Sequence, residues 1–316
     1  MSEAAAVAHP NIALVKYWGK RDRNLNLPAV PSLSLTLDGW ETNTSIDIGH
    51  ERFVLNKKEV VDPRVWRVLD LLDPERPDFD VTSKNNFPTA AGLASSSSGF
   101  AALAMAGGEI FGRRDPAAVS VLARRGSGSA CRSIHGGFVE WRMGTRADGA
   151  DSHAIPVASA DHWNVAMVIA IVDPSPKAVG STEGMERCLA TSPLWRAWVE
   201  PAENDVAEAR AAVLAKDIER LGTIMEQSTF RMFATMHTAK PPLIYWKPGT
   251  ITLLQAVLEL RASGVGAWVT MDAGPQVKVL CERADVRAVE RALEPHVRKG
   301  ALHVHGVGGP ARVTEW

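Results

Sequence analysis

Short segments in which apolar and polar residues alternate dominate the first third of the chain. The alternation is clear in Ser-Leu-Ser-Leu-Thr-Leu at 32–37 and in Thr-Asn-Thr-Ser-Ile-Asp-Ile at 42–48. A period of two is typical of strands with one buried face. Residues 51–58, in which Asn-Lys-Lys follows a short apolar run, predict a hairpin. We therefore expect an antiparallel sheet in this part of the chain.

Helical spacing of apolar residues begins at Pro63 and becomes dominant after residue 182. It predicts helices at 63–72, 99–111, 116–124, 184–190, 203–216, 218–236, 250–263 and 286–293. Further strands are predicted at 79–84, 137–142, 163–172, 265–271, 276–281 and 302–304. We expect the strand at 163–172 to close the first half. Helices and antiparallel strands segregated in this way indicate an α+β fold rather than a βαβ repeat.

Chain length predicts more than one domain. The 316 residues exceed the ~250–300 at which a single core tends to stop growing. Asp-Pro-Ser-Pro at 173–176 and Gly180 interrupt the pattern of elements. We therefore predict an N-terminal domain at 1–178 and a C-terminal domain at 179–316.

Charge and cysteine content narrow the class of partner. The 35 Lys and Arg residues nearly balance 36 Asp and Glu, without a long basic run, which argues against nucleic acid or an anionic membrane as a partner. The three cysteines form no C-x-x-C pair, so neither a disulfide framework nor a zinc site is indicated. The most apolar run, at 163–172, is about half of the ~20 residues of a membrane span. We expect a small-molecule partner and a cytoplasmic location.

Four consecutive serines, 95–98, follow a loop with Pro88 and Gly92 and precede an Ala-rich helical pattern. Glycine lets the backbone approach a ligand, and a helix start exposes unpaired N–H groups that attract anions. Phosphate is the natural ligand there, and the hydroxyls of Ser95 and Ser96 can bind its oxygens or complete a Mg²⁺ shell. The alternative is a serine N-cap with a polar linker, because serine is a preferred cap.

A second group of polar side chains follows an apolar run in Asn-Ile-Ala-Leu-Val-Lys-Tyr-Trp-Gly-Lys-Arg-Asp at 11–22. Tyr17 and Lys20 can offer an O–H and an ammonium to a diphosphate, and Asn11 can hydrogen-bond a polar substrate atom. The alternative is a strand that leads into a solvated, lysine-rich turn.

Gly-Ser-Gly-Ser-Ala-Cys-Arg-Ser at 126–133 places hydroxyls and the guanidinium of Arg132 on one Gly-rich loop. We expect this loop to be flexible and suited to an anionic ligand, because a guanidinium can bind two oxygens of one carboxylate. The alternative is an exposed loop with a surface arginine, which is the interpretation that we give to Arg124 and Arg125.

A carboxylate stands where a predicted strand becomes a turn, at Asp272 in Met-Asp-Ala-Gly-Pro. An aspartate held rigidly in this way can orient a hydroxyl or accept its proton. The alternative is an aspartate that caps its own turn.

The loop pattern P-x-x-x-G-L-x-S-S resembles the ATP-phosphate loop of the GHMP small-molecule kinase superfamily. This chain carries it on Pro88, Gly92, Leu93, Ser95 and Ser96. Further stretches resemble signatures of the diphosphomevalonate decarboxylase family, in the family's order and at comparable spacings nearly end to end. They are 11–22, 126–133, 181–185, 241–242 and 271–275.

The resemblance implies the two-domain GHMP architecture, with an N-terminal domain like domain 2 of ribosomal protein S5 and a ferredoxin-like α+β C-terminal domain. It implies the ATP-dependent decarboxylation of mevalonate 5-diphosphate to isopentenyl diphosphate, ADP, phosphate and CO₂, a step of isoprenoid biosynthesis through mevalonate. It also implies ATP and Mg²⁺ as cofactors and a homodimer as the assembly.

Roles for individual residues follow from the same resemblance. It gives catalytic roles to Asn11, Lys16, Arg132 and Asp272. It assigns the binding of substrate to Tyr17, Lys20, Ser127, Ser129 and Arg132. It assigns the binding of ATP to Pro88, Gly92, Leu93, Ser95, Ser96, Lys177, Ser181 and Thr182, with Ser95 and Ser96 also meeting the metal.

Related functions remain as alternatives. One is a phosphomevalonate decarboxylase or a mevalonate 3-kinase of the same fold, and another is a non-catalytic binding protein of that fold. A phosphate loop together with Asp272 argues against the binding protein. Some relatives with the first two activities alter diphosphate-binding or acid/base positions. This chain keeps Lys20, Ser127, Ser129, Arg132 and Asp272 together, which favours the full decarboxylase.

Overall fold

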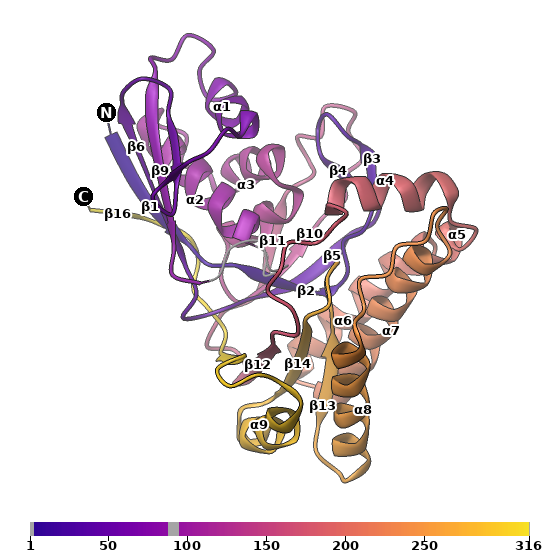
Figure 1. Cartoon of the computed structure of the whole chain (residues 1–316). Helices are drawn as coiled ribbons and strands as arrows, with labels where there is room; N and C mark the ends of the chain where they lie inside the picture. Colours follow the sequence, from indigo (N-terminus) through magenta and orange to yellow (C-terminus); the bar gives the residue numbers. More distant parts are fainter. Residues whose placement is uncertain (1–2, 88–94, 316) are drawn as a thin grey trace.

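A computed structural model describes residues 3–87 and 95–315 of the chain (Figure 1). Antiparallel pairing predominates in its sheets, and helices gather against their faces. This arrangement confirms the predicted α+β class. Among the described helices, none has both the length and the apolar character needed to cross a bilayer.

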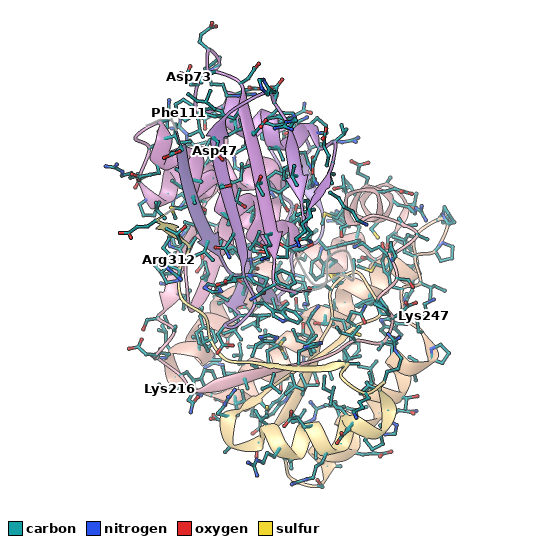
Figure 2. All side chains as sticks on the ribbon, turned by 60° about the vertical axis from the view of Figure 1, so that its left-hand side comes forward. Asp47, Asp73, Phe111, Lys216, Lys247 and Arg312 are labelled. Atoms are coloured by element: carbon teal, nitrogen blue, oxygen red, sulfur yellow. The ribbon has the colours of Figure 1, made fainter. Side chains whose placement is uncertain are left out.

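The first sheet holds both ends of the described chain. Its strands lie in the order β16-β1-β6-β9-β7-β8, and the β7–β9 pair is parallel. They are β1 (Glu3–Ala8), β6 (Thr42–Ile48), β7 (Phe53–Leu55), β8 (Lys58–Glu59), β9 (Phe79–Asn85) and β16 (Arg312–Thr314). The alternation predicted at 42–48 gives β6 one buried face and one more exposed face, and Figure 2 shows Asp47 of β6 and Arg312 of β16 on this sheet.

Helices cover the buried face of this sheet. They are α1 (Pro63–Asp70), α2 (Ser95–Ile110) and α3 (Pro116–Gly126). Proline opens α1 and α3, and the side chains of Asp62 and Asp115 cap them by accepting backbone N–H bonds. The buried face of α2 is rich in alanine, so this helix lies close to β1 and β6.

A second sheet, in the order β11-β10-β5-β2, leads into the other half of the molecule. Its strands are β2 (Asn11–Val15), β5 (Ser32–Thr36), β10 (Phe138–Trp141) and β11 (Ala154–Ala158). A small ribbon beside it pairs β3 (Lys20–Asp22) with β4 (Leu27–Pro28).

The third sheet has the order β13-β14-β12-β15 and carries most of the later helices. Its strands are β12 (Val165–Ala170), β13 (Ala267–Thr270), β14 (Val277–Glu282) and β15 (Leu302–His305). The α-helices of this half are α4 (Ser181–Thr191), α5 (Trp195–Val199), α6 (Ala202–Ala215), α7 (Ile218–His237), α8 (Pro248–Ala262) and α9 (Val286–Leu293). Short 3₁₀ helices are η1 (Gly128–Ile134), η2 (Arg283–Asp285) and η3 (Glu294–His296).

The prediction that the strand at 163–172 closes the first half is wrong. β12 pairs with β14 and β15 in the third sheet. All its residues are buried, with Ala166 and Val168 facing one apolar core and Met167 and Ile169 facing another. A strand covered on both faces is continuously apolar, so its pattern does not reveal which sheet it joins.

The division of the chain into domains at 178/179 stays a prediction.

Two expectations about the segment around residue 126 are also wrong. The Gly-rich stretch at 126–133 is not a flexible loop, because Gly126 ends α3 and residues from Gly128 onward form the largely buried 3₁₀ helix η1. Arg124 is fully buried rather than on the surface, because its guanidinium donates to the carbonyl oxygens of Leu25, Gly149 and Ser152. These carbonyls replace the water that the charged group loses on burial.

Candidate active site

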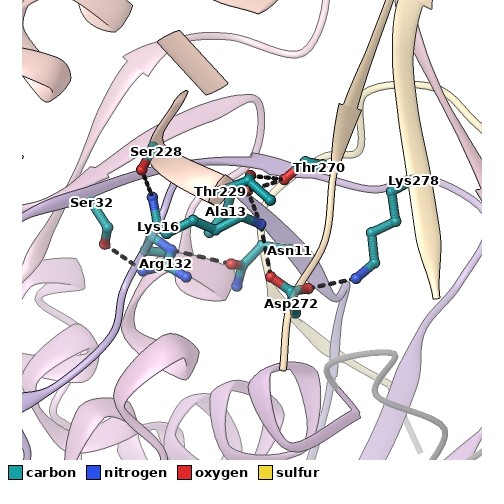
Figure 3. Close-up of polar contacts among 10 residues, drawn as sticks. All are labelled: Asn11, Ala13, Lys16, Ser32, Arg132, Ser228, Thr229, Thr270, Asp272 and Lys278. Carbon is teal, nitrogen blue, oxygen red and sulfur yellow. Dashed lines mark hydrogen bonds and ion pairs between the residues drawn. The ribbon is translucent and has the colours of Figure 1, made fainter. Parts of the chain in front are cut away.

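The carboxylate of Asp272 lies between two lysines (Figure 3). Lys16 Nζ donates to Oδ1 at 2.9 Å, and Lys278 Nζ donates to Oδ2 at 2.6 Å. Both lysine side chains are 1% exposed, whereas the side chain of Asp272 is 31% exposed. Both oxygens are therefore held while the carboxylate remains accessible to a ligand.

Elements from both halves of the chain position these groups. Lys16 directly follows β2, Asp272 lies just after β13, and Lys278 belongs to β14. The backbone N–H of Lys16 donates to Ser228 Oγ of α7 at 3.0 Å, which ties the end of β2 to the C-terminal half. Asp272 thus lies where a strand becomes a turn, as predicted, and its carboxylate is paired with Lys16, which is distant in sequence.

Burial and mutual charge set the protonation of this group. Burial lowers the pKa of Lys16 to about 8, although the neighbouring Asp272 carboxylate opposes the shift. Burial alone raises the pKa of Asp272, but the ammonium groups of Lys16 and Lys278 outweigh it and hold that pKa well below its usual range. Asp272 is therefore ionised and is a weak base.

The guanidinium of Arg132 is fixed beside this group by neutral partners. Its Nε donates to Asn11 Oδ1 at 3.1 Å, and Nη1 donates to Ser32 Oγ at 2.6 Å. Asn11 Nδ2 in turn donates to the Ser129 carbonyl at 3.1 Å and to Ser133 Oγ at 2.7 Å. The side chain of Arg132 is 2% exposed, and none of the described carboxylates forms a salt bridge with it.

Positive charge therefore exceeds negative charge in this buried group. The group contains three cationic side chains, those of Lys16, Lys278 and Arg132, and one carboxylate, that of Asp272. Arg132 is close enough to lower the pKa of Lys16. A buried charge without a partner is costly, so the arrangement favours an anionic ligand.

Tyr17 offers a hydroxyl to such a ligand. The hydroxyl oxygen is buried and has no hydrogen-bond partner among the described residues. Burial raises the pKa of Tyr17 above its ordinary value, so the phenol keeps its proton and remains a donor. A Cβ at Gly128 would lie 2.8 Å from the hydroxyl oxygen and 3.0 Å from Trp141 Cη2, so the close approach requires glycine here.

Lys20 and Lys177 are each tethered to the start of α4. Lys20 Nζ donates to Asn26 Oδ1 at 2.7 Å and to Thr182 Oγ1 at 3.4 Å. Lys177 Nζ donates to Ser181 Oγ at 2.7 Å and to the Ala273 carbonyl at 2.9 Å. Lys177 thus stands next to the turn that carries Asp272, and burial lowers the pKa values of both lysines.

The start of α2 meets the segment before η1. Ser96 Oγ lies 3.2 Å from Ser127 Oγ, so the predicted ATP loop and the predicted diphosphate-binding segment are neighbours. Ser95 is the first residue of α2, whose first N–H groups have no partner within the helix. Pro88, Gly92 and Leu93 lie outside the described residues.

These hydroxyls suit a Mg²⁺ ion that is held mainly by phosphates. Within 3–87 and 95–315, no group of three or more His, Cys, Asp or Glu side chains is placed to hold a metal ion. Mg²⁺ commonly keeps several waters and few protein ligands when phosphates share its shell. Ser95 and Ser96 therefore fit an ion that arrives with a nucleotide.

Sequence analysis missed Lys278 and Ser228. Lys278 stands alone in the apolar run Val-Lys-Val-Leu-Cys, and a lysine in a buried strand requires an anionic partner. That signal was available in the sequence. No sequence pattern indicates Ser228, because its contact depends on how α7 packs against β2.

Comparisons with known proteins agree across the whole chain. Residues 8–154 match the diphosphomevalonate decarboxylase-like N-terminal domain, and residues 167–305 match the mevalonate 5-diphosphate decarboxylase C-terminal domain. The diphosphomevalonate decarboxylase of Candida albicans is 36% identical over 321 residues, which cover 94% of this chain and 89% of the relative. The human diphosphomevalonate decarboxylase is 37% identical over 310 residues, which cover 88% of this chain and 76% of the relative.

Solved structures agree with these matches. The mevalonate diphosphate decarboxylase from Staphylococcus aureus superposes with a TM-score of 0.93 at 34% identity, covering 99% of this chain and 98% of that one. MDDEF, solved in complex with MVAPP, AMPPCP and magnesium, superposes with a TM-score of 0.92 at 39% identity and covers 99% of each chain.

Proposed function

The chain belongs to the diphosphomevalonate decarboxylase family, and on this premise we propose how its charged group carries out the reaction. The reaction is the ATP-dependent decarboxylation of mevalonate 5-diphosphate to isopentenyl diphosphate, ADP, phosphate and CO₂. The observation that carries the proposal is the accessible Asp272 carboxylate held by Lys16 and Lys278, with the guanidinium of Arg132 nearby.

Chemistry explains why ATP is needed. A 3-hydroxy acid that loses CO₂ to become an alkene must expel its tertiary hydroxyl, which is a poor leaving group. Phosphorylation turns that oxygen into the leaving group of a phosphate ester. The site must therefore bind a diphosphate, the ATP phosphates and a carboxylate, and it must direct the hydroxyl toward the γ-phosphorus.

Asp272 orients the 3-hydroxyl and takes its proton. A bond forms between this oxygen and the γ-phosphorus, the bond from phosphorus to the ADP oxygen breaks, and the proton passes to Asp272. Phosphate then departs with the C3–O electron pair, the C1–C2 pair becomes the double bond, and CO₂ is released. Because the two ammonium groups make Asp272 a weak base, the proton transfers late, after the forming P–O bond has made it acidic.

The substrate's own charges match the remaining cations. Arg132 binds the C1 carboxylate with the donors that Asn11 and Ser32 leave free. Tyr17, Lys20, Ser127 and Ser129 bind the diphosphate. The unpartnered Tyr17 hydroxyl supports this assignment, because a bound phosphate oxygen supplies the missing acceptor.

The nucleotide is held on the α2 side of the site. Ser95, Ser96 and the first N–H groups of α2 bind ATP phosphates, and Lys177, Ser181 and Thr182 approach from the start of α4. Bound Mg²⁺ offsets the negative charge of these phosphates. Pro88, Gly92 and Leu93 complete the predicted loop.

One assay tests the function. Purified protein is mixed with ATP, Mg²⁺ and either mevalonate 5-diphosphate or mevalonate 5-phosphate, and ADP, phosphate and CO₂ are each quantified. We expect the three products in equal amounts. ADP without CO₂ would indicate the 3-kinase, and turnover restricted to mevalonate 5-phosphate would indicate the monophosphate decarboxylase.

We also propose a homodimer that works in the cytoplasm. Ile251 and Leu258 are exposed apolar residues seven positions apart on α8, which places them on one helix face that a second copy can cover. The three cysteines are free and buried, which suits a reducing compartment. The molar mass measured by light scattering on protein eluted from a size-exclusion column should be about twice the chain mass of 34.1 kDa. A molar mass equal to that of one chain would contradict the dimer.

A further inference from the structure

Lys278 is a charged residue in a strand that is otherwise built from apolar side chains. Its neighbours Val277, Val279 and Leu280 are fully buried, and its own side chain is 1% exposed. An apolar residue would fill this position without the cost of taking an ammonium out of water. The presence of lysine therefore indicates a use for the charge.

The charge of Lys278 is directed at the proposed base. Its Nζ lies 2.6 Å from Asp272 Oδ2, while Oδ1 is already paired with Lys16. One ammonium would suffice to neutralise one carboxylate, so Lys278 adds net positive charge to the site. It also fixes the second oxygen, so the carboxylate cannot rotate about its bond to Cβ when a substrate arrives.

We propose that Lys278 is a positioning residue of the phosphoryl-transfer step, which acts by holding Asp272 ionised and in one orientation while Lys16 binds the other oxygen. The proposal rests on the proposed function of Asp272. Lys278 need not touch substrate, because its effect is transmitted through the carboxylate and through repulsion of the Lys16 proton.

The charged groups around Lys278 determine the direction of the effect. Asp272 on the β13–β14 turn, Lys16 after β2 and Lys177 before α4 interact with Lys278 directly, and Arg132 in η1 acts on Asp272 and Lys16. Three of the four are cations, so removing the Lys278 charge makes it easier for the others to keep a proton. The pKa values of both Asp272 and Lys16 should rise in its absence.

The test compares Lys278→Met with Lys278→Arg. Methionine fills a similar volume without charge, whereas arginine keeps the charge. In the methionine variant we expect kcat to fall roughly tenfold or more, with the KM of each substrate within about threefold of wild type, since one pKa unit of electrostatic interaction corresponds to a factor of ten. In the profile of kcat against pH, the acidic and the alkaline limb of the methionine variant should both move to higher pH. In the arginine variant both limbs should lie close to their wild-type positions.

A matched control and a second readout separate the possible failures. Lys299 is exposed and outside the site, so Lys299→Met should leave the profile unchanged. The titration of Lys16 Nζ is followed by NMR with labelled lysine, and Lys16→Met identifies the signal. This signal should titrate at higher pH in Lys278→Met whether or not turnover is detected.

The outcomes are distinct. Wild-type protein without turnover on mevalonate 5-diphosphate contradicts the proposed function, and the Lys16 titration still tests the role of Lys278. An unchanged titration and unchanged pH limbs, with only a lower melting temperature, overturn the inference in favour of a structural role. Should Lys278→Met fail to fold, Lys278→Gln provides the uncharged variant.

Discussion

Asn11 joins Arg132 to the helix that carries it. The Asn11 side chain accepts from Arg132 Nε at 3.1 Å and donates to the Ser129 carbonyl at 3.1 Å, so one amide links β2 with η1. Because Ser32 takes Nη1, the guanidinium is held in a fixed plane before any ligand binds. Such preorganisation favours a carboxylate that approaches in that plane.

Arg132→Lys should therefore behave as a disruptive substitution. An ammonium cannot bond Asn11, Ser32 and a substrate carboxylate in one plane. We expect kcat/KM for mevalonate 5-diphosphate to fall roughly tenfold or more, the effect of losing a hydrogen bond to a charged group. Steady-state kinetics measure this, and Arg125→Lys, outside this network, is the control. Wild-type kinetics in Arg132→Lys would return Arg132 to a structural role.

Gly128→Ala tests the approach of Tyr17 to η1. The new Cβ would lie 2.8 Å from the Tyr17 hydroxyl oxygen, so the phenol must move. We expect the KM for mevalonate 5-diphosphate to rise roughly fivefold or more, as for a lost hydrogen bond to phosphate, while the KM for ATP changes little. Gly309→Ala is the control, because a Cβ there meets nothing within 4 Å. An equal rise in both KM values would argue against a specific diphosphate contact.

Local patterns predicted many of the elements and the position of Asp272 at the end of a strand. Period-two alternation indicated β5 and β6, and proline marked the starts of α1 and α3. The strand-to-turn position of Asp272 followed from the residues beside it. These features depend on neighbours in sequence, which determine dihedral preferences. The alternation marks the buried face of β6, whereas β5 is buried on both faces.

Contacts across the fold were not predictable in this way. The sheet that β12 joins depends on which strands can pair with it, and its uniformly apolar residues leave that choice open. The burial of Arg124 depends on three carbonyls from two segments that are distant from it in sequence, at residue 25 and at 149–152. The Lys278–Asp272 pair depends on the geometry of the β13–β14 turn, although the lone lysine in an apolar strand gave a local sign of it.

The double variant Ser95→Ala/Ser96→Ala should impair the use of MgATP more than folding. Both hydroxyls stand at the start of α2, and Ser96 reaches Ser127 at 3.2 Å. We expect the KM for ATP to rise roughly tenfold or more, from lost bonds to charged phosphate oxygens. Melting temperature is measured alongside, with Ser45→Ala on the first sheet as the control. Unchanged ATP kinetics in the folded double variant would leave the serines as a cap alone.

Activity should fall as pH rises through the pKa of Lys16, which is about 8. Above this pKa, Lys16 loses its proton and with it the charge that holds the Asp272 carboxylate. The stability of the folded protein should move in the opposite direction. The pKa of Lys16 is 10.5 in the unfolded chain, so between about pH 8 and 10.5 the unfolded state binds more protons at Lys16 than the folded state does. The contribution of Lys16 to the free energy of unfolding therefore rises with pH in this range. Profiles of kcat and of melting temperature, compared with Lys16→Met, check both directions. An alkaline loss of activity that merely follows unfolding would contradict the role of Lys16.

Asp272→Asn removes the proposed base and also leaves two buried ammonium groups without their carboxylate. Stability should therefore fall together with activity, because breaking a buried ion pair exposes the cost of the remaining charges. A lower melting temperature consequently does not separate a catalytic from a structural aspartate. The separating quantity is kcat of the folded protein, which we expect to fall on the order of a hundredfold or more if Asp272 takes the hydroxyl proton. The variant Lys16→Met/Asp272→Asn removes one cation with the carboxylate, so it should recover part of the melting temperature but none of the turnover. Recovery of turnover along with stability would mean that Asp272 only neutralises its lysines, and another group would then have to accept the proton.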